Sequence, residues 1–207
     1  MDIRRDFYLE KLIKRKNNGL IKVITGIRRC GKSYLLNNIF YHHLLDSGVE
    51  ADHIIRFAFD SADDLYLIGE SLIQIEKEKR GADPEKFMAY IRSKTTGEGI
   101  YYLLLDEIQM LDCFEAVLNG YLRKENIDVF VTGSNAKLLS KDIATEFAGR
   151  GDEIHMYPLS FAEFMSVYNG DKYTGLSEYM LYGGIPLVVL RDGAGDKATA
   201  LQNLFKE

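Results

Sequence analysis

One octapeptide near the N-terminus constrains this 207-residue chain more than any other feature. It reads Gly26-Ile27-Arg28-Arg29-Cys30-Gly31-Lys32-Ser33 and lies between an apolar run over 20–25 and a segment of helical periodicity from residue 34 onward. A glycine, four residues and then Gly-Lys-Ser between a strand and a helix is the phosphate-binding P-loop pattern. The alternative interpretation is a glycine-rich turn that carries a surface lysine.

The chemistry of phosphate binding explains the residue types in this loop. Backbone N–H groups must converge on one point, and glycine is needed where a side chain would block the turn or the phosphate. The helix that starts near Lys32 adds the positive end of its dipole. Lys32 is placed to reach the β- and γ-phosphates, and the Ser33 hydroxyl is placed to ligate Mg²⁺. ATP and Mg²⁺ are therefore the predicted cofactors.

A second informative stretch runs from Ile100 to Gln109 and contains adjacent acids at Asp106 and Glu107. Its continuous apolar run is typical of a central parallel strand that is buried on both faces. The acids then lie beyond the C-terminal end of that strand, where ligands bind in open parallel sheets. Asp106 is predicted to help hold Mg²⁺, and Glu107 to orient and deprotonate the attacking water. The alternative is that the pair caps the following helix.

Polar residues also follow the predicted strand over 127–132. Ser134 and Asn135 come after Gly133 and would lie between the acidic pair and the γ-phosphate, where they could report whether that phosphate is present. A small-residue turn that caps a short helix over 136–139 explains them equally well.

The remaining pattern predicts an α/β fold of the P-loop NTPase type: a parallel five-stranded sheet sandwiched by helices, with a short C-terminal helical appendage. The predicted strands cover 20–25, 53–59, 100–105, 127–132 and 153–157. The predicted helices cover 3–18, 34–46, 65–79, 84–94, 112–124 and 196–207. We expect a P-loop ATPase domain over 1–165, and over 166–207 a helical lid or the start of a truncated C-terminal region.

Composition excludes several classes of function. The net charge is −5 with a pI of about 5.5, so no global basic field would attract nucleic acid or an anionic membrane. Arg4 and Arg5 are expected on a solvated face. Cys30 and Cys113 lack the spacing of a zinc site, although a thiol in the phosphate loop would lie beside a cationic site. Neither a signal peptide nor a membrane span is visible, which predicts a cytoplasmic protein.

Several ordered motifs together resemble one family. They are the P-loop, Leu103 to Gln109, Val131 to Asn135, Gly149-Arg150, Pro158 to Phe161, and Tyr182 to Pro186. This combination resembles the prokaryotic AAA-type ATP-binding proteins with a paired-arginine P-loop, relatives of the signal-transduction ATPases with numerous domains. The resemblance covers almost the whole chain.

The resemblance implies a role for each matching residue. Lys32 and Ser33 match Walker A, Asp106 and Glu107 match Walker B, and Ser134 and Asn135 match the sensor position. It also implies that Arg150 reaches a phosphate, either in its own subunit or in a neighbouring one. The second case would require a homo-oligomer. Family members usually continue into a C-terminal domain, so the resemblance implies a further domain or a partner protein. The predicted nucleotide-binding residues are Gly26, Arg28, Arg29, Cys30, Gly31, Lys32, Ser33 and Tyr34. The predicted catalytic residues are Glu107, Arg150, Asn135 and Ser134. The predicted metal ligands are Ser33 and Asp106.

Three functions compete. The first is an Mg-dependent ATP hydrolase that couples its nucleotide state to attached domains or partners. The second is a nucleotide-gated binding switch that hydrolyses little or no ATP. The third, a small-molecule kinase, is disfavoured because the adjacent Asp-Glu pair suits activation of water rather than of a bound hydroxyl. Direct nucleic-acid binding is disfavoured by the acidic charge.

Overall fold

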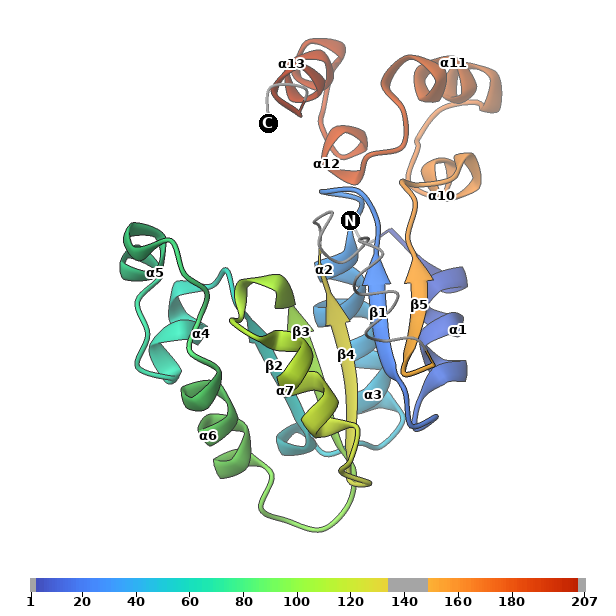
Figure 1. Cartoon of the computed structure of the whole chain (residues 1–207). Helices are drawn as coiled ribbons and strands as arrows, with labels where there is room; N and C mark the ends of the chain where they lie inside the picture. The colour runs from blue at the N-terminus through green and yellow to red at the C-terminus, as the bar shows by residue number, and fades with distance from the viewer. Residues whose placement is uncertain (1–2, 134–148, 205–207) are drawn as a thin grey trace.

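The computed structural model describes residues 3–133 and 149–204. Its centre is a parallel five-stranded sheet in the order β2-β3-β4-β1-β5, which confirms the predicted fold class (Figure 1). The strands are β1 (Ile21–Thr25), β2 (Ile54–Ala58), β3 (Tyr101–Asp106), β4 (Ile127–Thr132) and β5 (Gly151–His155). Because all strands run in one direction, their C-terminal ends meet at one edge of the sheet.

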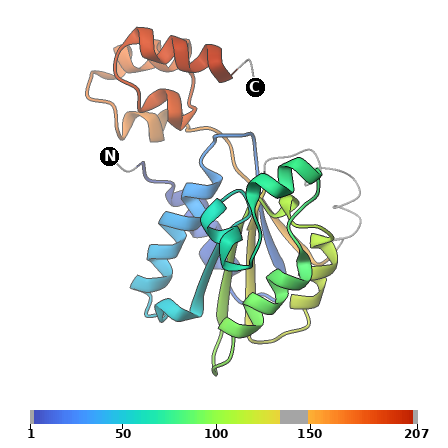
Figure 2. The ribbon, with the colours of Figure 1, turned by 90° about the vertical axis from the view of Figure 1, so that its left-hand side faces the viewer.

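Helices cover both faces of the sheet (Figures 1 and 2). One face packs against α1 (Asp6–Arg15) and the long helix after the P-loop, which is divided into α2 (Lys32–Tyr34), the π-helical segment η1 (Leu35–Phe40) and α3 (Tyr41–Asp46). The other face packs against α4 (Ala62–Leu67), α5 (Leu72–Glu78), α6 (Pro84–Lys94) and α7 (Phe114–Tyr121). The 3₁₀ turns η2 (Ala51–His53) and η3 (Ile108–Met110) precede β2 and follow β3.

Two buried clusters correspond to these two faces. In β1 to β4, alternate residues contribute to opposite clusters, as the period of a strand requires. In β3, for example, Leu103 and Leu105 join the α4–α7 side, and Leu104 joins the α1–α3 side. The predicted central strand is therefore buried on both faces.

The centre of the sheet also contains one buried ion pair. Lys22 of β1 is fully buried and pairs with Asp128 of β4. Lys22 Nζ also donates to the Leu20 carbonyl at 2.7 Å, and Asp128 accepts from the Asn17 amide at 2.9 Å. Burial lowers the pKa of the Lys22 ammonium, and the charge of Asp128 opposes this shift.

Local sequence signals fix several helix ends. Asp83 accepts hydrogen bonds from the amides of Glu85 and Lys86 at the start of α6, with Pro84 in the first turn, as the sequence predicts. Ser160 and Glu163 form a capping box at the start of α10 (Phe161–Met165).

Other predicted bounds were wrong. The single helix expected over 65–79 is two helices, because the chain turns at Gly69, which has φ +69°, and restarts after Ser71. The first helix is shorter at both ends than the predicted 3–18. Residues 172–182, for which no helix was predicted, form α11 (Lys172–Tyr182).

The last helices lie beyond the C-terminal edge of the sheet (Figure 1). They are α10, α11, α12 (Pro186–Val189) and α13 (Ala194–Leu204). A Cβ built on Gly31 of the P-loop would lie 3.9 Å from Pro186 Cγ, so α12 begins close to that loop. In the described ranges, every helix is too short or too polar to cross a lipid bilayer.

Candidate functional site

The P-loop connects the C-terminal end of β1 to α2, and its glycines adopt backbone conformations that other residues rarely do. Gly26 has φ +140° and Gly31 has φ +100°. A Cβ on Gly26 would lie 2.2 Å from the carbonyl oxygen of Met156, far inside van der Waals contact. Glycine is therefore required at position 26 both by dihedral angle and by space.

Lys32 lies inside this loop rather than in solvent. Its side chain is 5% exposed. Its Nζ donates to the carbonyl oxygens of Gly26 at 3.0 Å and Ile27 at 3.1 Å. The loop thus holds an ammonium at the N-terminus of a helix, where the helix dipole also favours an anion.

Asp106 is the point at which the site converges. Its Oδ1 accepts from Ser33 Oγ at 3.1 Å and from the Thr132 hydroxyl, and its Oδ2 accepts from Asn37 Nδ2 at 3.2 Å. These donors come from α2, η1 and β4, so one carboxylate joins three elements. The two predicted metal ligands, Ser33 and Asp106, are therefore in direct contact.

The pKa of Asp106 reflects this environment. Burial raises the pKa of its carboxyl above the ordinary value, hydrogen bonds from Thr132 and Ser33 oppose that shift, and the charges of Glu107 and Asp60 add to it. A cation at this position would relieve both the desolvation and the repulsion between carboxylates. The donor set of hydroxyl and carboxylate oxygens also fits Mg²⁺, which prefers oxygen ligands.

Glu107 is half-buried at the C-terminal end of β3. It has φ +52°, an uncommon backbone conformation for a residue other than glycine. Its amide donates to Thr132 Oγ1 at 3.2 Å, and its carboxylate accepts from Gln109 Nε2. Its side chain makes no capping hydrogen bond to η3, so the helix-cap alternative does not describe Glu107.

Three residues of this site were missed by the sequence analysis. Thr132 ends an apolar strand and bridges Asp106 to the Glu107 backbone. The sequence could have indicated a role for Thr132, because a hydroxyl at the C-terminal end of a buried strand lies at the ligand-binding edge of the sheet. Asn37 and Gln109 had no comparable signal, because only the turn of η1 and the fold of η3 bring their amides to the acids.

Arg5 was predicted on a solvated face, and that prediction was wrong. Its side chain is 3% exposed and donates to the carbonyl oxygens of Cys30 at 3.3 Å and Tyr157 at 2.7 Å. Its Nε lies 3.0 Å from Glu163 Oε1, an ion pair without hydrogen-bond alignment, and its guanidinium lies 4.7 Å from the Tyr8 ring centroid. Arg5 thereby ties the P-loop to β5 and α10.

The other P-loop residues occupy different environments. Arg28, Arg29 and Tyr34 are exposed, and Arg29 has φ +66°. Cys30 is fully buried, and burial raises the pKa of its thiol while the charges of Lys32 and Arg5 oppose the shift. A buried thiol with a raised pKa is a poor nucleophile, which argues against a redox role.

Of the remaining predicted residues, the structure places only Arg150. Ser134 and Asn135 lie outside the described residues. Arg150 precedes β5, and its carbonyl accepts from the amide of Ile21 at the start of β1. Since β1 rises about 3.3 Å per residue, Arg150 lies on the order of 16 Å from the loop that begins at Gly26. Its guanidinium donates instead to Asn119 Oδ1 at 3.2 Å, so Arg150 does not belong to the site of its own chain in this arrangement.

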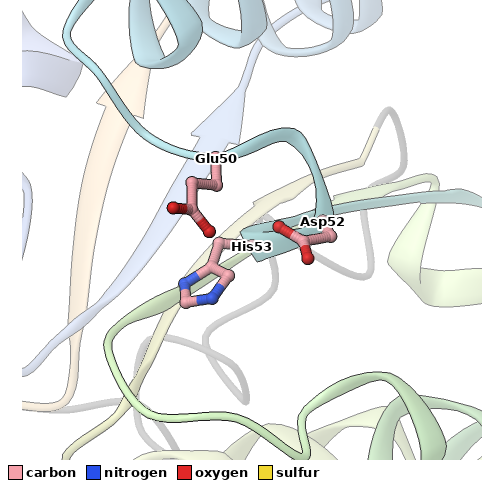
Figure 3. A group of neighbouring side chains, drawn as sticks. All are labelled: Glu50, Asp52 and His53. Atoms are coloured by element: carbon pink, nitrogen blue, oxygen red, sulfur yellow. The ribbon is translucent and has the colours of Figure 1, made fainter.

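A second group of potential metal ligands lies elsewhere (Figure 3). Ligand atoms of Glu50, Asp52 and His53 lie within 4.8 Å of one another, around the turn that precedes β2. That turn is at the N-terminal end of the strand, opposite the P-loop edge. Glu50 and Asp52 are exposed, and exposed acidic groups are common without an ion, so we assign no role to this group.

Comparison with known proteins identifies the family. A family model described as an AAA domain matches residues 18–165. An uncharacterized protein of Haemophilus influenzae is 36% identical over 209 residues, which cover 98% of this chain and 48% of that protein. An uncharacterized protein of Methanocaldococcus jannaschii is 31% identical over 218 residues, which cover 97% of this chain and 42% of that protein. The chain thus spans about half or less of these relatives.

Solved structures agree on the fold. AMPPCP-bound DnaA from Aquifex aeolicus has a TM-score of 0.52 and 15% identity, with 94% of this chain and 63% of that chain covered. The Aeropyrum pernix ORC1 protein in complex with DNA has a TM-score of 0.50 and 13% identity, with 86% and 50% covered. At such identities the likeness concerns the fold alone. Together with the P-loop geometry and the match over most of the chain, these findings show that the protein belongs to the AAA domain family of P-loop ATPases.

Proposed function

We propose that this chain binds Mg·ATP and hydrolyses it, coupling its nucleotide state to the C-terminal helices and to partners beyond them. One observation carries the proposal: the hydroxyl of Ser33 contacts the carboxylate of Asp106 at 3.1 Å, beside a loop whose first position only glycine can occupy. The helix N-terminus, the lysine in the loop and the acidic pair all follow C-terminal strand ends at this edge of the sheet, which supports the proposal.

Each residue has a role that follows from its position. Loop amides and Lys32 bind the phosphates. To do so, Lys32 Nζ gives up its hydrogen bonds to the carbonyl oxygens of Gly26 and Ile27 and donates to phosphate oxygens instead. Ser33 and Asp106 hold Mg²⁺, which neutralises charge on the transferring phosphoryl group when bound. Glu107 orients the attacking water and takes its proton. Thr132 fixes the orientation of Asp106 and the backbone of Glu107.

The surroundings supply the rest of the binding site. We assign nucleotide contacts to Arg28, Arg29 and Tyr34, which are exposed around the loop, and to the backbone of Cys30. A cavity of about 930 Å³ between α1 and α10–α11 is bordered by Arg4, Phe7 and Tyr157, and it is our candidate for the base. Residues 1–165 would then form the ATPase domain and 166–207 the lid. Tyr8 also borders this cavity, but it is largely buried and its hydroxyl accepts from the Tyr157 amide, so we assign it no contact with the base.

Arg150 is assigned to a neighbouring subunit. It is exposed on the edge opposite the P-loop of its own chain, so a phosphate contact requires a second copy. Mixing Lys32→Ala chains with Arg150→Ala chains should restore activity in the mixed assembly, because one interface then has both groups. Mixed assemblies that form but regain no activity would contradict the assignment in trans.

Binding is tested by calorimetry with ATP, with and without Mg²⁺. Lys32→Ala should weaken ATP binding strongly, and the wild type should bind more tightly when Mg²⁺ is present. Lys14→Ala is the matched control, because Lys14 is a lysine on the surface of α1 whose side chain is 74% exposed. Equal binding by wild type and Lys32→Ala would refute the proposed site.

Hydrolysis is tested with Glu107→Gln, which distinguishes the hydrolase from a switch. In a hydrolase the variant should retain bound ATP and lose phosphate release by about 10²-fold or more, because the general base is removed. If the variant and the wild type release phosphate equally slowly and both cycle by exchange, the protein is a nucleotide-gated switch. Phosphate found on a metabolite instead of in solution would show a kinase.

A further inference from the structure

A groove follows the outer edge of β2, which is the last strand on one side of the sheet. Its volume is about 590 Å³. One wall is formed by the helix after the P-loop, through Asn37 and Tyr41, and the other by α6, through Tyr90 and Lys94. The floor is the edge of β2 itself. In the described part of the chain, no strand pairs with this edge.

The outward-facing amides at the two ends of β2 are already hydrogen-bonded. The amide of Phe59 donates to the Asp106 carbonyl, so odd-numbered residues of β2 pair with β3 and even-numbered residues face outward. At one end, the Ala58 amide donates to Asp64 Oδ2 at 2.7 Å and its carbonyl accepts from Ser61. At the other end, the Ile54 amide donates to the Ala51 carbonyl. Between these closed ends, the N–H and C=O of Arg56 face the groove.

Each wall carries a cation beside an aromatic ring. The Arg56 guanidinium lies 4.0 Å from the centroid of Tyr41, and Lys94 Nζ lies 5.7 Å from the centroid of Tyr90. Arg56 and Lys94 are both exposed. The acids at the groove lie toward its ends, where Asp64 is bonded to the Ala58 amide and Asp52 belongs to the preceding turn. The middle of the groove is therefore basic, although the whole chain has a net charge of −5.

We propose that this groove binds an extended acidic segment of a partner protein, which adds to the sheet as a strand beside β2. Adjacent side chains of an extended segment point to opposite faces. Two consecutive acidic residues would therefore meet Arg56 on one wall and Lys94 on the other. Main-chain bonds to Arg56 would supply affinity, and the two cations would supply the preference for acid.

Such a partner would also be connected to the P-loop edge. Arg56 Nη1 donates to the Asn37 carbonyl at 3.2 Å, and Asn37 Nδ2 donates to Asp106 Oδ2 at 3.2 Å. An acidic residue of the partner that binds the Arg56 guanidinium would compete with the hydrogen bond from Arg56 to Asn37. Because Asn37 positions Asp106, binding in the groove would act on the site. This connection rests on the proposed function, whereas binding in the groove does not, so the experiment is done without nucleotide.

The probe is the capped hexapeptide acetyl-Thr-Val-Glu-Glu-Val-Thr-amide, labelled with a fluorophore and titrated with wild-type protein. Anisotropy should show saturable binding, and amide hydrogen exchange at Arg56 should slow by about tenfold or more when the peptide is bound. The same peptide with Lys-Lys in place of Glu-Glu should not bind. A peptide N-methylated at its two central residues should bind more weakly, because it lacks the donors for main-chain pairing.

Charge-reversal variants test the two walls separately. Arg56→Glu and Lys94→Glu should each weaken binding of the acidic peptide by about tenfold, and Lys14→Glu on α1 should leave it unchanged. Binding without protection of the Arg56 amide, or binding that survives both reversals, would overturn the proposal. So would concentration-dependent protection of Arg56 in protein alone, because that result would make a second copy of the chain the occupant.

Discussion

Arg5 provides the most informative perturbation outside the acidic pair. Its buried guanidinium holds together three parts of the chain: the Cys30 carbonyl in the P-loop, the Tyr157 carbonyl after β5, and Glu163 at the start of α10. Arg5→Met preserves much of the apolar stem and removes the charge and its donors. We expect this variant to be destabilised and to bind nucleotide more weakly.

The magnitude follows from the contacts. Hydrogen bonds that involve a charged group contribute about 1.5–3 kcal/mol each, and Arg5 makes two to carbonyls, one buried and one partly buried. Glu163 is 19% exposed and adds less, on the order of 0.5–1 kcal/mol. Methionine regains part of the packing against Tyr8. The net loss in the free energy of unfolding is about 3–5 kcal/mol. For a chain of this size, that loss corresponds to a fall in Tm of roughly 6–20 °C.

Differential scanning fluorimetry without nucleotide measures this change directly. Lys14→Met on the same end of the chain is the control, because its ion pair with Glu10 is solvent-exposed at 3.7 Å and should contribute almost nothing. Hydrogen exchange should then locate the loosening at 26–33 and at 159–165. If Arg5→Met melts within about 2 °C of Lys14→Met, Arg5 does not hold these segments together.

Three further changes follow from the buried polar groups and the loop. Since burial raises the pKa of Asp106, its ionised form opposes folding, and Asp106→Asn should be more stable than wild type near pH 8 without Mg²⁺. Chemical denaturation should show that this gain in stability shrinks as the pH falls through the raised pKa toward the ordinary value of about 3.9. A gain that grows instead would contradict the sign. Lys22→Met should lower the free energy of unfolding in urea by about 3–5 kcal/mol, because it leaves Asp128 buried without its partner. The double variant Lys22→Met, Asp128→Leu should recover part of that loss, and no recovery would mean that packing dominates. Gly26→Ala should abolish ATP binding in calorimetry, because its Cβ would meet the Met156 carbonyl at 2.2 Å, and retained binding would show that the loop can shift.

Much of the fold was predictable because its signals are local. The apolar run that ends at Asp106 indicates a buried parallel strand wherever it occurs, and Asp83-Pro84 indicates a helix start. Parallel strands then bring Ser33 and Asp106 to one edge of the sheet, 73 residues apart in sequence and 3.1 Å apart in space. The order of the strands did not have to be known for that prediction to be made.

The sequence could not predict contacts that depend on how elements pack. Arg5 resembles any surface arginine in a charged N-terminal segment, and only the approach of β5 and α10 buries it. The phosphate role of Arg150 was implied only by the family resemblance, and only the register of β5 against β1 places this residue at the edge away from the P-loop.

By itself, the sequence determined the phosphate loop, the acidic pair and the parallel sheet, because glycine dihedral angles, apolar runs and strand direction are properties of short segments. Tertiary structure alone decided that Thr132 and Asn37 hold Asp106, that Arg5 joins the loop to α10, and that Arg56 is left open on the edge of β2. The physical reason is that a hydrogen bond acts over about 3 Å. Side chains that are distant in the sequence come within that range only when the layers of the fold are packed.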